Sequence, residues 1–272
     1  MLSALLSLDH LNVIAHRGGS KLRPENTLAA FDHAVTLGVD AIECDVQLSR
    51  DGEVVVIHDA TLDRTTDARG PVSSLSAAEL GRVDAGFHFG TAQGHPCRGK
   101  GVYVPRLAEV LDRHPAIPMV VEIKGNQPEV ADTVLGVIGD ADALDRVIVG
   151  GFSQAVLERA RKVNKDAVTS ASKEEARWAL YRSYFRLAPT DPQYWLFQVP
   201  FRFRGRRRFR RAFVETVGRI NLPVQEWVVD DPDDMRRLID WGANGIISDR
   251  PDLAKTIVKL EGGPVQRRVM RF

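Results

Sequence analysis

The sequence lacks the features that mark disulfide-rich, membrane-spanning or strongly charged proteins. It has only two cysteines, Cys44 and Cys97, in 272 residues, so no disulfide framework is expected. Lysine and arginine together number 37 against 36 aspartates and glutamates, so the net charge of the whole chain says little about partners. No nucleic-acid partner is expected, because the basic charge is confined to one stretch of a neutral chain. No apolar run is long enough to cross a bilayer. The 44% hydrophobic content is typical of a globular protein with a sizeable core.

Short apolar segments alternate with segments of helical periodicity along most of the chain. Counting a hairpin at 53–58 as part of the second unit, eight such β-α repeats are present, which predicts a parallel sheet closed into a TIM (β/α)8 barrel of the α/β class. No glycine-rich dinucleotide fingerprint follows the first strand, and this weakens an open Rossmann sheet as the alternative. The expected strands are 12–15, 39–48, 118–124, 147–152, 167–170, 195–199, 223–229 and 245–248.

We expect one catalytic barrel domain spanning residues 1–272, with a small insertion over one barrel end, after the second strand at about 61–104, and a loose C-terminal tail at 261–272. The apolar stretch from Leu2 to Leu6 lacks a basic region before it, so we interpret it as a cap on the barrel floor rather than a signal peptide. With no signal peptide or transmembrane helix expected, a cytoplasmic location is predicted.

Two carboxylates, Glu43 and Asp45, lie two residues apart in the second predicted strand. Alternate strand residues share a face, so both acids point to one side, while Cys44 points towards the helix layer. Like charges this close are unfavourable when buried unless a cation neutralises them, and carboxylate oxygens are the ligands that Mg²⁺ and Ca²⁺ prefer. The alternative is a half-exposed strand whose acids face water.

Other chemically active residues also fall at the ends of predicted strands. His16 and Arg17 end the first strand, His58 ends the hairpin, and Glu122 and Lys124 end the third barrel strand. Barrel active sites lie at the carboxyl ends of strands, so we expect these residues to meet. Three carboxylates for a cation, two histidines for proton transfer and two cations for an anion suit cleavage of a phosphate ester. Taken singly, each histidine could be structural and Glu122–Lys124 a simple ion pair.

These residues resemble the glycerophosphodiester phosphodiesterase family, and the similarity runs from about Asn12 to Leu260. The matching motifs are His16-Arg17-Gly18, Pro24-Glu25-Asn26-Thr27-Leu28, Glu43-Cys44-Asp45-Val46, His58-Asp59, Leu62-Asp63-Arg64-Thr65-Thr66, Pro105-Arg106-Leu107, Glu122-Ile123-Lys124 and Gly245-Ile246-Ile247-Ser248-Asp249-Arg250-Pro251.

The resemblance implies a TIM barrel with an insertion after the second strand and one divalent cation, Mg²⁺ or Ca²⁺. It implies that Glu43, Asp45 and Glu122 bind this metal, that His16 and His58 act as acid and base, and that Arg17 and Lys124 contact the phosphate. A usual Trp-Thr-Val-Asn run is replaced here by Trp227-Val228-Val229-Asp230, which keeps the tryptophan expected in the substrate pocket. We place Gln198, where the sixth strand ends, in the same pocket.

Three functions are compatible with this pattern. The first is hydrolysis of glycerophosphodiesters to glycerol 3-phosphate and an alcohol. The second is lysophospholipase D activity on lysophospholipids, which requires an apolar channel or flap near the site. The third, a catalytically silent barrel that binds lipid surfaces, is disfavoured because no expected metal or proton-transfer residue is missing; a cyclising phospholipase C is a weaker option. The leaving alcohol, the metal, the first nucleophile and the oligomeric state stay open.

The segment from Trp178 to Phe213 is unusually rich in aromatic residues and arginine. It holds eleven of the nineteen Phe, Trp and Tyr residues, and seven arginines fall between Arg202 and Arg211 with no acid among them. Aromatic rings beside arginines suit a lipid headgroup layer, so we expect an interfacial or substrate-gating element that contacts anionic membrane. The alternative is a solvated basic loop and aromatic residues that belong to the core.

Overall fold

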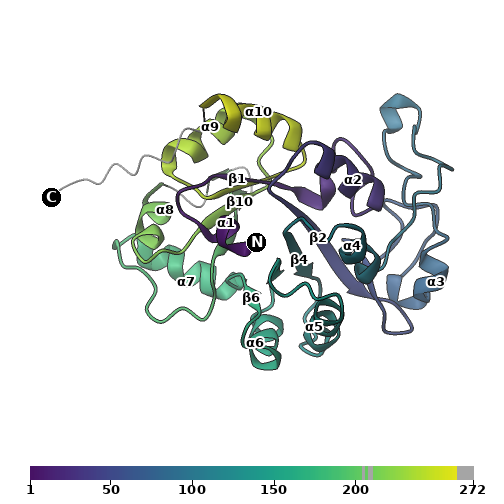
Figure 1. Cartoon of the computed structure of the whole chain (residues 1–272), viewed down its shortest axis with the longest axis horizontal. Coiled ribbons are helices and arrows are strands. Elements are labelled where there is room, and N and C mark those ends of the chain that lie inside the picture. The colour runs from purple at the N-terminus through teal and green to yellow at the C-terminus, as the bar shows by residue number, and fades with distance from the viewer. Residues whose placement is uncertain (204–205, 208–210, 262–272) are drawn as a thin grey trace.

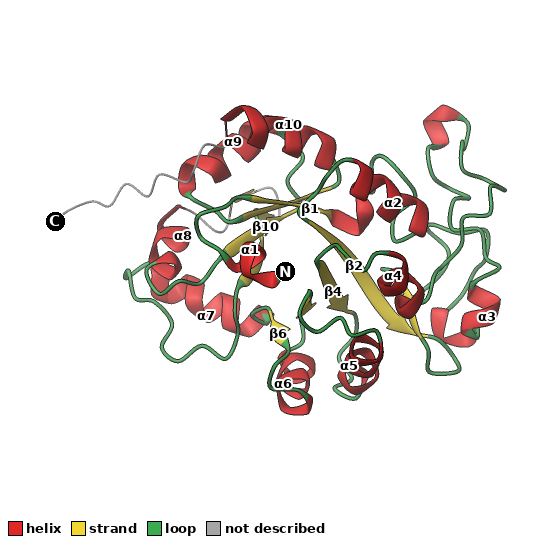
Figure 2. Cartoon of the chain, in the orientation of Figure 1, coloured by secondary structure: helices red, strands yellow, loops and turns green. Residues whose placement is uncertain are grey.

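Eight parallel strands form the centre of the molecule and helices surround them (Figures 1 and 2). The computed structural model describes residues 1–203, 206–207 and 211–261. The eight strands are β1 (Asn12–Ala15), β2 (Ala41–Leu48), β4 (Met119–Ile123), β5 (Val147–Gly151), β6 (Val168–Thr169), β7 (Phe197–Pro200), β10 (Val224–Trp227) and β11 (Gly245–Ser248).

The strands follow one another around the sheet in chain order, and the last returns to the first. β1 pairs with β2 on one side and with β11 on the other, Asn12 lying opposite Gly245. The remaining ends, β6 and β7, are joined by a parallel bridge between Ser170 and Leu196, and the N–H of Ala171 donates to the Leu196 carbonyl at 2.9 Å. The predicted (β/α)8 barrel is confirmed.

The bounds of helix α9 (Pro232–Trp241) follow from signals in the sequence. In α9, the Asp231 side chain accepts from the backbone N–H groups of Asp233 and Asp234, Pro232 takes the first position, and Gly242 ends the helix with φ 75°. The helices around the barrel are α2 (Leu28–Thr36), α4 (Leu107–Arg113), α5 (Val130–Asp140), α6 (Gln154–Val163), α7 (Lys173–Ser183), α8 (Arg211–Gly218), α9 (Pro232–Trp241) and α10 (Pro251–Glu261).

The alternation of side chains along β2 divides the core into an outer and an inner layer. Cys44 is fully buried among the apolar residues between strands and helices, as predicted, so Glu43 and Asp45 point into the barrel. The first helix, α1 (Leu2–Leu6), packs Leu2 and Leu5 against inward-facing barrel residues and thereby caps the floor, as predicted.

After β2 the chain forms a short antiparallel strand, β3 (Val54–Val56), and then the predicted insertion. The insertion contains η2 (Val72–Ser74), α3 (Ala77–Leu80) and η3 (Thr91–Gln93), and it lies beside the barrel rather than over its end (Figure 1). Ser76 and Glu79 form a capping box at α3, where the sequence gives a helix signal. The insertion has its own apolar cluster built on β3.

Asn26 is a residue type that often caps helices, and it stands just before α2. It has φ 57° and does not cap the helix; the cap is Thr27, whose side chain accepts from the N–H of Ala30. Within the described part of the chain, no helix is long and apolar enough to cross a membrane. The predicted tail from residue 262 onwards, and Arg204, Arg208 and Arg210 of the arginine-rich stretch, lie outside the described residues.

Candidate active site

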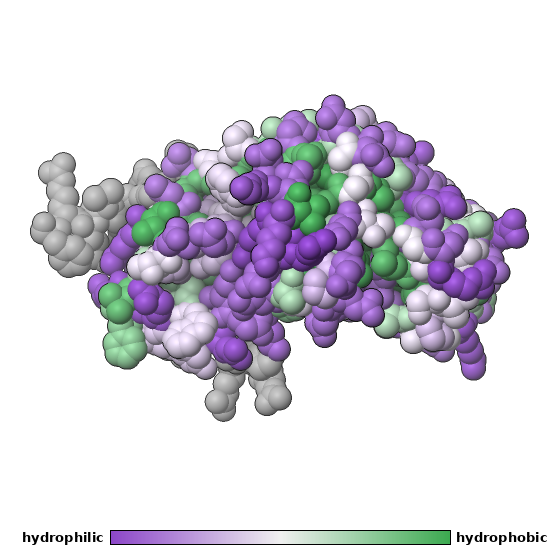
Figure 3. All heavy atoms as spheres, turned by 90° about the horizontal axis from the view of Figure 1, so that it is seen from below, coloured by the Kyte–Doolittle hydropathy of each residue, from purple (hydrophilic) through white to green (hydrophobic). Residues whose placement is uncertain are grey.

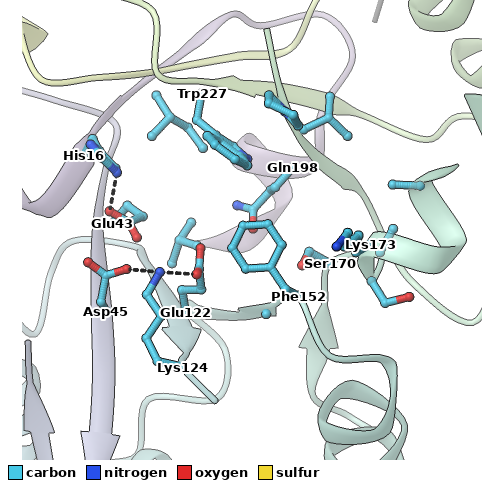
Figure 4. A pocket seen from close by; sticks show the side chains of 18 of the residues that line it. His16, Glu43, Asp45, Glu122, Lys124, Phe152, Ser170, Lys173, Gln198 and Trp227 are labelled. Carbon is cyan, nitrogen blue, oxygen red and sulfur yellow. Dashed lines mark hydrogen bonds and ion pairs between the residues drawn. The ribbon is translucent and has the colours of Figure 1, made fainter. Parts of the chain in front are cut away.

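A cavity of about 480 Å³ opens at the carboxyl ends of the barrel strands. All nine site residues proposed from the sequence line it, and Figure 4 shows its charged side facing Phe152, Gln198 and Trp227. The structure therefore brings together side chains that are more than two hundred residues apart in the sequence. The nine are His16, Arg17, Glu43, Asp45, His58, Glu122, Lys124, Gln198 and Trp227.

Three carboxylates form the centre of the charged side. One oxygen from each of Glu43, Asp45 and Glu122 lies within 4.8 Å of the other two, and Glu43 and Asp45 are only 4% and 1% exposed. The alternative in which these acids face water is therefore wrong. The donor set is all oxygen and mostly buried, which matches the ligands that Mg²⁺ and Ca²⁺ require.

Two cations already counter part of this negative charge. The Lys124 ammonium lies 2.8 Å from Asp45 Oδ1 and also contacts Glu122, and Arg17 Nε lies 3.0 Å from Asp45 Oδ2. Burial acts to raise the pKa of Asp45, but Lys124 and Arg17 outweigh it and hold that pKa below its usual value. Asp45 is consequently a carboxylate rather than a carboxylic acid.

Glu43 has the opposite balance. Burial, followed by the charge of Asp45, raises its pKa to about 8. Its Oε2 accepts a hydrogen bond from the Arg17 backbone N–H at 2.8 Å and lies 4.0 Å from His16 Nε2. A divalent cation bound here would favour the charged form of this acid.

Each candidate proton-transfer histidine is held by an aspartate. His16 Nδ1 donates to Asp249 at 2.6 Å, and His58 Nδ1 donates to Asp59 at 2.6 Å. Burial acts to lower the pKa of His16, but Glu43 and Asp249 raise it above its ordinary value. Since each Nδ1 is engaged, Nε2 of each ring is the atom left to exchange a proton with a substrate.

The aspartate beside His58 is itself fixed by Arg64, a residue of the insertion. Arg64 donates to Asp59 at 2.6 Å and, through both terminal nitrogens, to Glu25 at 2.7 Å. These hydrogen bonds with Arg64 lower the pKa of Asp59 to about 2. The insertion therefore contributes to the orientation of His58 without lining the cavity itself.

A tight turn places Arg17 beside the acids. Arg17 has φ 52°, a conformation that few non-glycine residues adopt, and Gly18 follows with φ 80°. A Cβ at Gly18 would lie 2.7 Å from the Cβ of Ala30, so only glycine lets this turn approach α2 so closely. The turn is therefore fixed by close packing.

The departure at Asp230 has a structural role close to His16. Asp230 Oδ1 accepts from Ser248 Oγ and from the Asp249 backbone N–H, both at 2.8 Å, and its Oδ2 pairs with Lys21 at 2.8 Å. Asp230 therefore fixes the strand end that carries Asp249, and Asp249 in turn orients His16.

The opposite side of the cavity is mainly apolar. Phe152 and Trp227 pack edge to face with centroids 5.8 Å apart, and Ala176 and Leu180 of α7 extend this surface. Gln198 donates to Gln225 at 2.9 Å. The cavity therefore has one side suited to a charged group of a ligand and an opposite side suited to an apolar group.

Sequence reasoning missed Asp249, Asp59, Arg64 and Asn26 as supporting residues, although all belong to the quoted motifs. Asn26 donates to Asp45 Oδ2 at 2.8 Å and accepts from the Asp45 N–H through its Oδ1. A charged or amide residue directly beside a site motif, as in His58-Asp59 and Ser248-Asp249, was the available signal.

The aromatic and arginine-rich segment divides between core and surface. Tyr194, Phe197 and Phe213 are buried in one apolar cluster, as the alternative interpretation requires. Arg202 donates to Asp234 at 2.8 Å and Arg211 to Glu215 at 2.7 Å, so both arginines have partners within the protein.

Comparisons with known proteins agree with this geometry. Residues 16–253 match the Glycerophosphoryl diester phosphodiesterase family. The chain is 32% identical over 268 residues to a glycerophosphodiester phosphodiesterase of Caldanaerobacter subterraneus subsp. tengcongensis, covering 92% of this chain and 98% of that protein. It is 27% identical over 264 residues to a lysophospholipase D of Mus musculus, covering 89% of this chain and 84% of that protein.

Solved structures show the same architecture. The crystal structure of a glycerophosphodiester phosphodiesterase from Agrobacterium tumefaciens superimposes with a TM-score of 0.73 and 27% sequence identity. The match covers 90% of this chain and 99% of the other.

Proposed function

The chain belongs to the glycerophosphoryl diester phosphodiesterase family and is a hydrolase of glycerophosphodiesters, and from this premise we propose how its own residues divide the work. Glu43, Asp45 and Glu122 hold one divalent cation, His16 and His58 transfer protons, and Arg17 and Lys124 bind the phosphate. Trp227 and Gln198 contact the rest of the substrate. The products are glycerol 3-phosphate and an alcohol.

One observation carries this proposal above all others. Three carboxylates, two aspartate-held histidines and two cations lie around one cavity at the carboxyl ends of the strands. Any one of these groups has an ordinary structural explanation, but their convergence on a single cavity supplies everything that cleavage of a phosphate ester requires.

The carboxylates fit a hard divalent cation, because they offer only oxygen and because burial, followed by the charge of Asp45, raises the pKa of Glu43 to about 8 in the absence of a cation. When bound, such a cation neutralises charge developing on the phosphoryl oxygens. Carboxylates serve Mg²⁺ and Ca²⁺ alike, and we propose Mg²⁺ or Ca²⁺ as the ion.

The remaining groups act on the phosphate and on two protons. Arg17 and Lys124 hold the phosphate oxygens from the side of Asp45, their partner in the structure. One imidazole removes a proton through Nε2 from the attacking nucleophile, and the other donates a proton to the departing alkoxide. The nucleophile is either water, which gives glycerol 3-phosphate directly, or a hydroxyl of the substrate, in which case water must then open the resulting cyclic phosphate. Asp249 and Asp59 keep both rings in the orientation that this exchange needs.

A lysophospholipid is the second candidate substrate, and the apolar side of the cavity favours it. Phe152, Ala176, Leu180 and Trp227 offer a carbon surface larger than glycerol alone requires. The similarity to a lysophospholipase D of Mus musculus supports the same reading. With this substrate the chemistry is unchanged, and only the group that occupies the apolar side differs.

A product assay tests both candidates. The purified protein is offered glycerophosphocholine, glycerophosphoethanolamine and lysophosphatidylcholine, each with Mg²⁺, with Ca²⁺ and after exhaustive chelation. We expect glycerol 3-phosphate from the first two substrates in the presence of metal only. Release of choline from lysophosphatidylcholine at a comparable rate would establish the second activity.

The proposal is wrong in its metal assignment if chelated protein retains full activity. It is wrong in its substrate assignment if none of the three compounds is cleaved by protein that is folded and metal-loaded.

A further inference from the structure

One face of helix α7 lines the cavity, and an adjacent face of the same helix carries exposed aromatic side chains. Lys173, Ala176, Arg177 and Leu180 line the cavity. Trp178, Tyr181 and Phe185 follow at spacings of three and four residues, so they form a second stripe along the helix and its C-terminal end. We name these three residues the aromatic stripe.

The aromatic stripe is strongly exposed. Its side chains are 68%, 49% and 78% exposed, in chain order. Twelve large hydrophobic side chains are exposed in the described part of the chain, and six of them fall within residues 178–195, the other three being Tyr184, Leu187 and Trp195. Half of the exposed apolar groups are thus concentrated in one short segment, and such concentration marks an interaction surface.

Figure 3 shows the molecule from below the view of Figure 1. Hydrophilic side chains cover much of this face, and hydrophobic ones appear right of the centre and at the left end, the side where Figure 1 places α7.

The stripe adjoins the mouth of the cavity, and cations lie between the two. Arg177 and Tyr181 are four residues apart and therefore neighbours on the helix surface. Lys173 and Arg177 are exposed, and neither has an ion pair with any described residue. Exposed tryptophan and tyrosine beside cations suit the headgroup layer of a membrane, where rings enter the interface and cations meet lipid phosphate.

We propose that the aromatic stripe docks the protein on an anionic phospholipid surface, with the cavity mouth at Lys173 and Arg177 turned towards the lipid. This inference rests on the proposed function, because a lipid-derived substrate would then enter the cavity from the surface on which it is formed. The choice of a lipid surface over a second copy of the chain follows from the cations at the cavity mouth and from the carbon surface within.

Vesicle sedimentation tests the docking without any turnover. The protein is mixed with vesicles of phosphatidylcholine, with and without phosphatidylglycerol, at low and at high salt. We expect binding to the anionic vesicles that weakens with salt. Replacing Trp178, Tyr181 and Phe185 by serine should reduce this binding by at least about tenfold, because apolar area no longer enters the interface.

A matched control replaces three exposed apolar residues elsewhere, Val35, Val163 and Leu260, by serine. This variant should bind vesicles as the native protein does. Both variants should cleave glycerophosphocholine at the native rate, since none of the six residues lines the cavity.

Tryptophan fluorescence locates the contact. Tryptophan emission should shift to shorter wavelength when vesicles are added to the native protein. A Trp241→Phe variant should show the same shift, because Trp241 packs against Phe201 and is not part of the aromatic stripe. The shift should be smaller in Trp178→Phe.

The docking inference fails if the native protein ignores anionic vesicles at low salt, or if both triple variants lose binding equally. A stripe-dependent dimer with no vesicle binding would identify a second copy as the occupant and would also overturn it. Vesicle binding without cleavage of any phosphodiester would instead retain the docking and refute the proposed function.

Discussion

Strands β2 and β10 each carry a buried glutamate whose pKa is raised to about 8, yet the two sites are unlike. Glu43 points into the barrel, where Asp45, Glu122 and His16 surround it. Glu226 lies between the inward-facing Gln225 and Trp227, so it points to the outer layer, and it is 0% exposed.

The causes of the two shifts differ. At Glu43, burial acts together with the charge of a neighbouring carboxylate, and a cation could reverse the effect. At Glu226, burial alone acts, and neither oxygen has a hydrogen-bond partner among the described residues. A raised pKa therefore does not identify a functional site; the neighbouring groups decide whether the acid belongs to a charge network or is simply isolated in the core.

The same chemical change at both positions should separate them most clearly. Glu43→Gln should lower turnover of glycerophosphocholine by about 10⁴-fold, since several kcal/mol of charge stabilisation correspond to several factors of ten. Glu226→Gln should remain within about twofold of the native rate, because Glu226 does not line the cavity and makes no contact with the substrate in either the ground state or the transition state. Steady-state kinetics measures both, with circular dichroism as the check on folding. Equal losses would show that the comparison is mistaken.

Substitution of the two cavity histidines tests their proposed role in proton transfer. His16→Ala and His58→Ala should each lower turnover by about 10²–10⁴-fold, the usual contribution of a general acid or base. The exposed His88 supplies the control, and His88→Ala should be silent. Near-native turnover in His58→Ala would remove that residue from the mechanism.

Metal binding should distinguish the two glutamates by stability rather than rate. Saturating metal at a hundredfold excess over its Kd should add about 2.7 kcal/mol to the native protein and to Glu226→Gln by linkage. Glu43→Gln should gain less, because one ligand is lost. Thermal unfolding with and without Mg²⁺ or Ca²⁺ measures this, and an equal gain in all three proteins would place the metal elsewhere.

The raised pKa of Glu226 should make the free energy of unfolding depend on pH. Its pKa is raised in the folded state, so above the ordinary value of 4.5 the unfolded chain binds fewer protons than the native protein. Stability therefore falls as pH rises from about 4.5 to 8, by up to about 1.4 kcal/mol per pH unit, and stays level above that range.

Glu226→Gln should remove this part of the fall, and urea unfolding of both proteins between pH 5 and 9 isolates it as a difference. Parallel stability curves for the two proteins would mean that Glu226 has a partner or a solvent path. The inner carboxylates titrate in both proteins and cancel in the difference.

The smallest expected effect tests whether Asp230, which holds Asp249 and so acts indirectly on His16, contributes to activity. Asp230→Ala removes the acceptor for the Asp249 N–H and should lower turnover by about tenfold, as loss of an outer hydrogen bond commonly does. Asp230→Asn keeps an acceptor oxygen but loses the charge facing Lys21, and turnover should recover to within about threefold of native. Failure of asparagine to rescue would assign the effect to charge.

Local periodicity was enough to predict most of the fold and the charged half of the site. A period of two along β2 places Glu43 and Asp45 on one face and Cys44 on the other, and the barrel rule then brings the strand ends together. The boundaries of α9 follow from Asp231, Pro232 and Gly242, which act within a few residues. These features depend on the chain near them.

The features that were missed depend on tertiary contacts. Asn26 has the composition of a helix cap, but its side chain is used by Asp45, nineteen residues away. The lack of a hydrogen-bond partner for Glu226 among the described residues could not be predicted either, because it depends on which helices cover the strand. Similarly, Arg202 in the basic segment has a specific partner, Asp234, that composition does not indicate.

The hydrogen bond between His16 and Asp249 has a consequence for the time at which the protein becomes active during its synthesis on the ribosome. The two residues are 233 positions apart, and β11, which carries Asp249 at its end, is the strand that closes the barrel against β1. A ribosome adding about 5–20 residues per second delivers Asp249 roughly 10–50 s after His16. For the later part of that interval, once Glu122 has been synthesised, the nascent chain contains all three carboxylates but no partner for His16 Nδ1, so we expect activity only after Asp249 has been added.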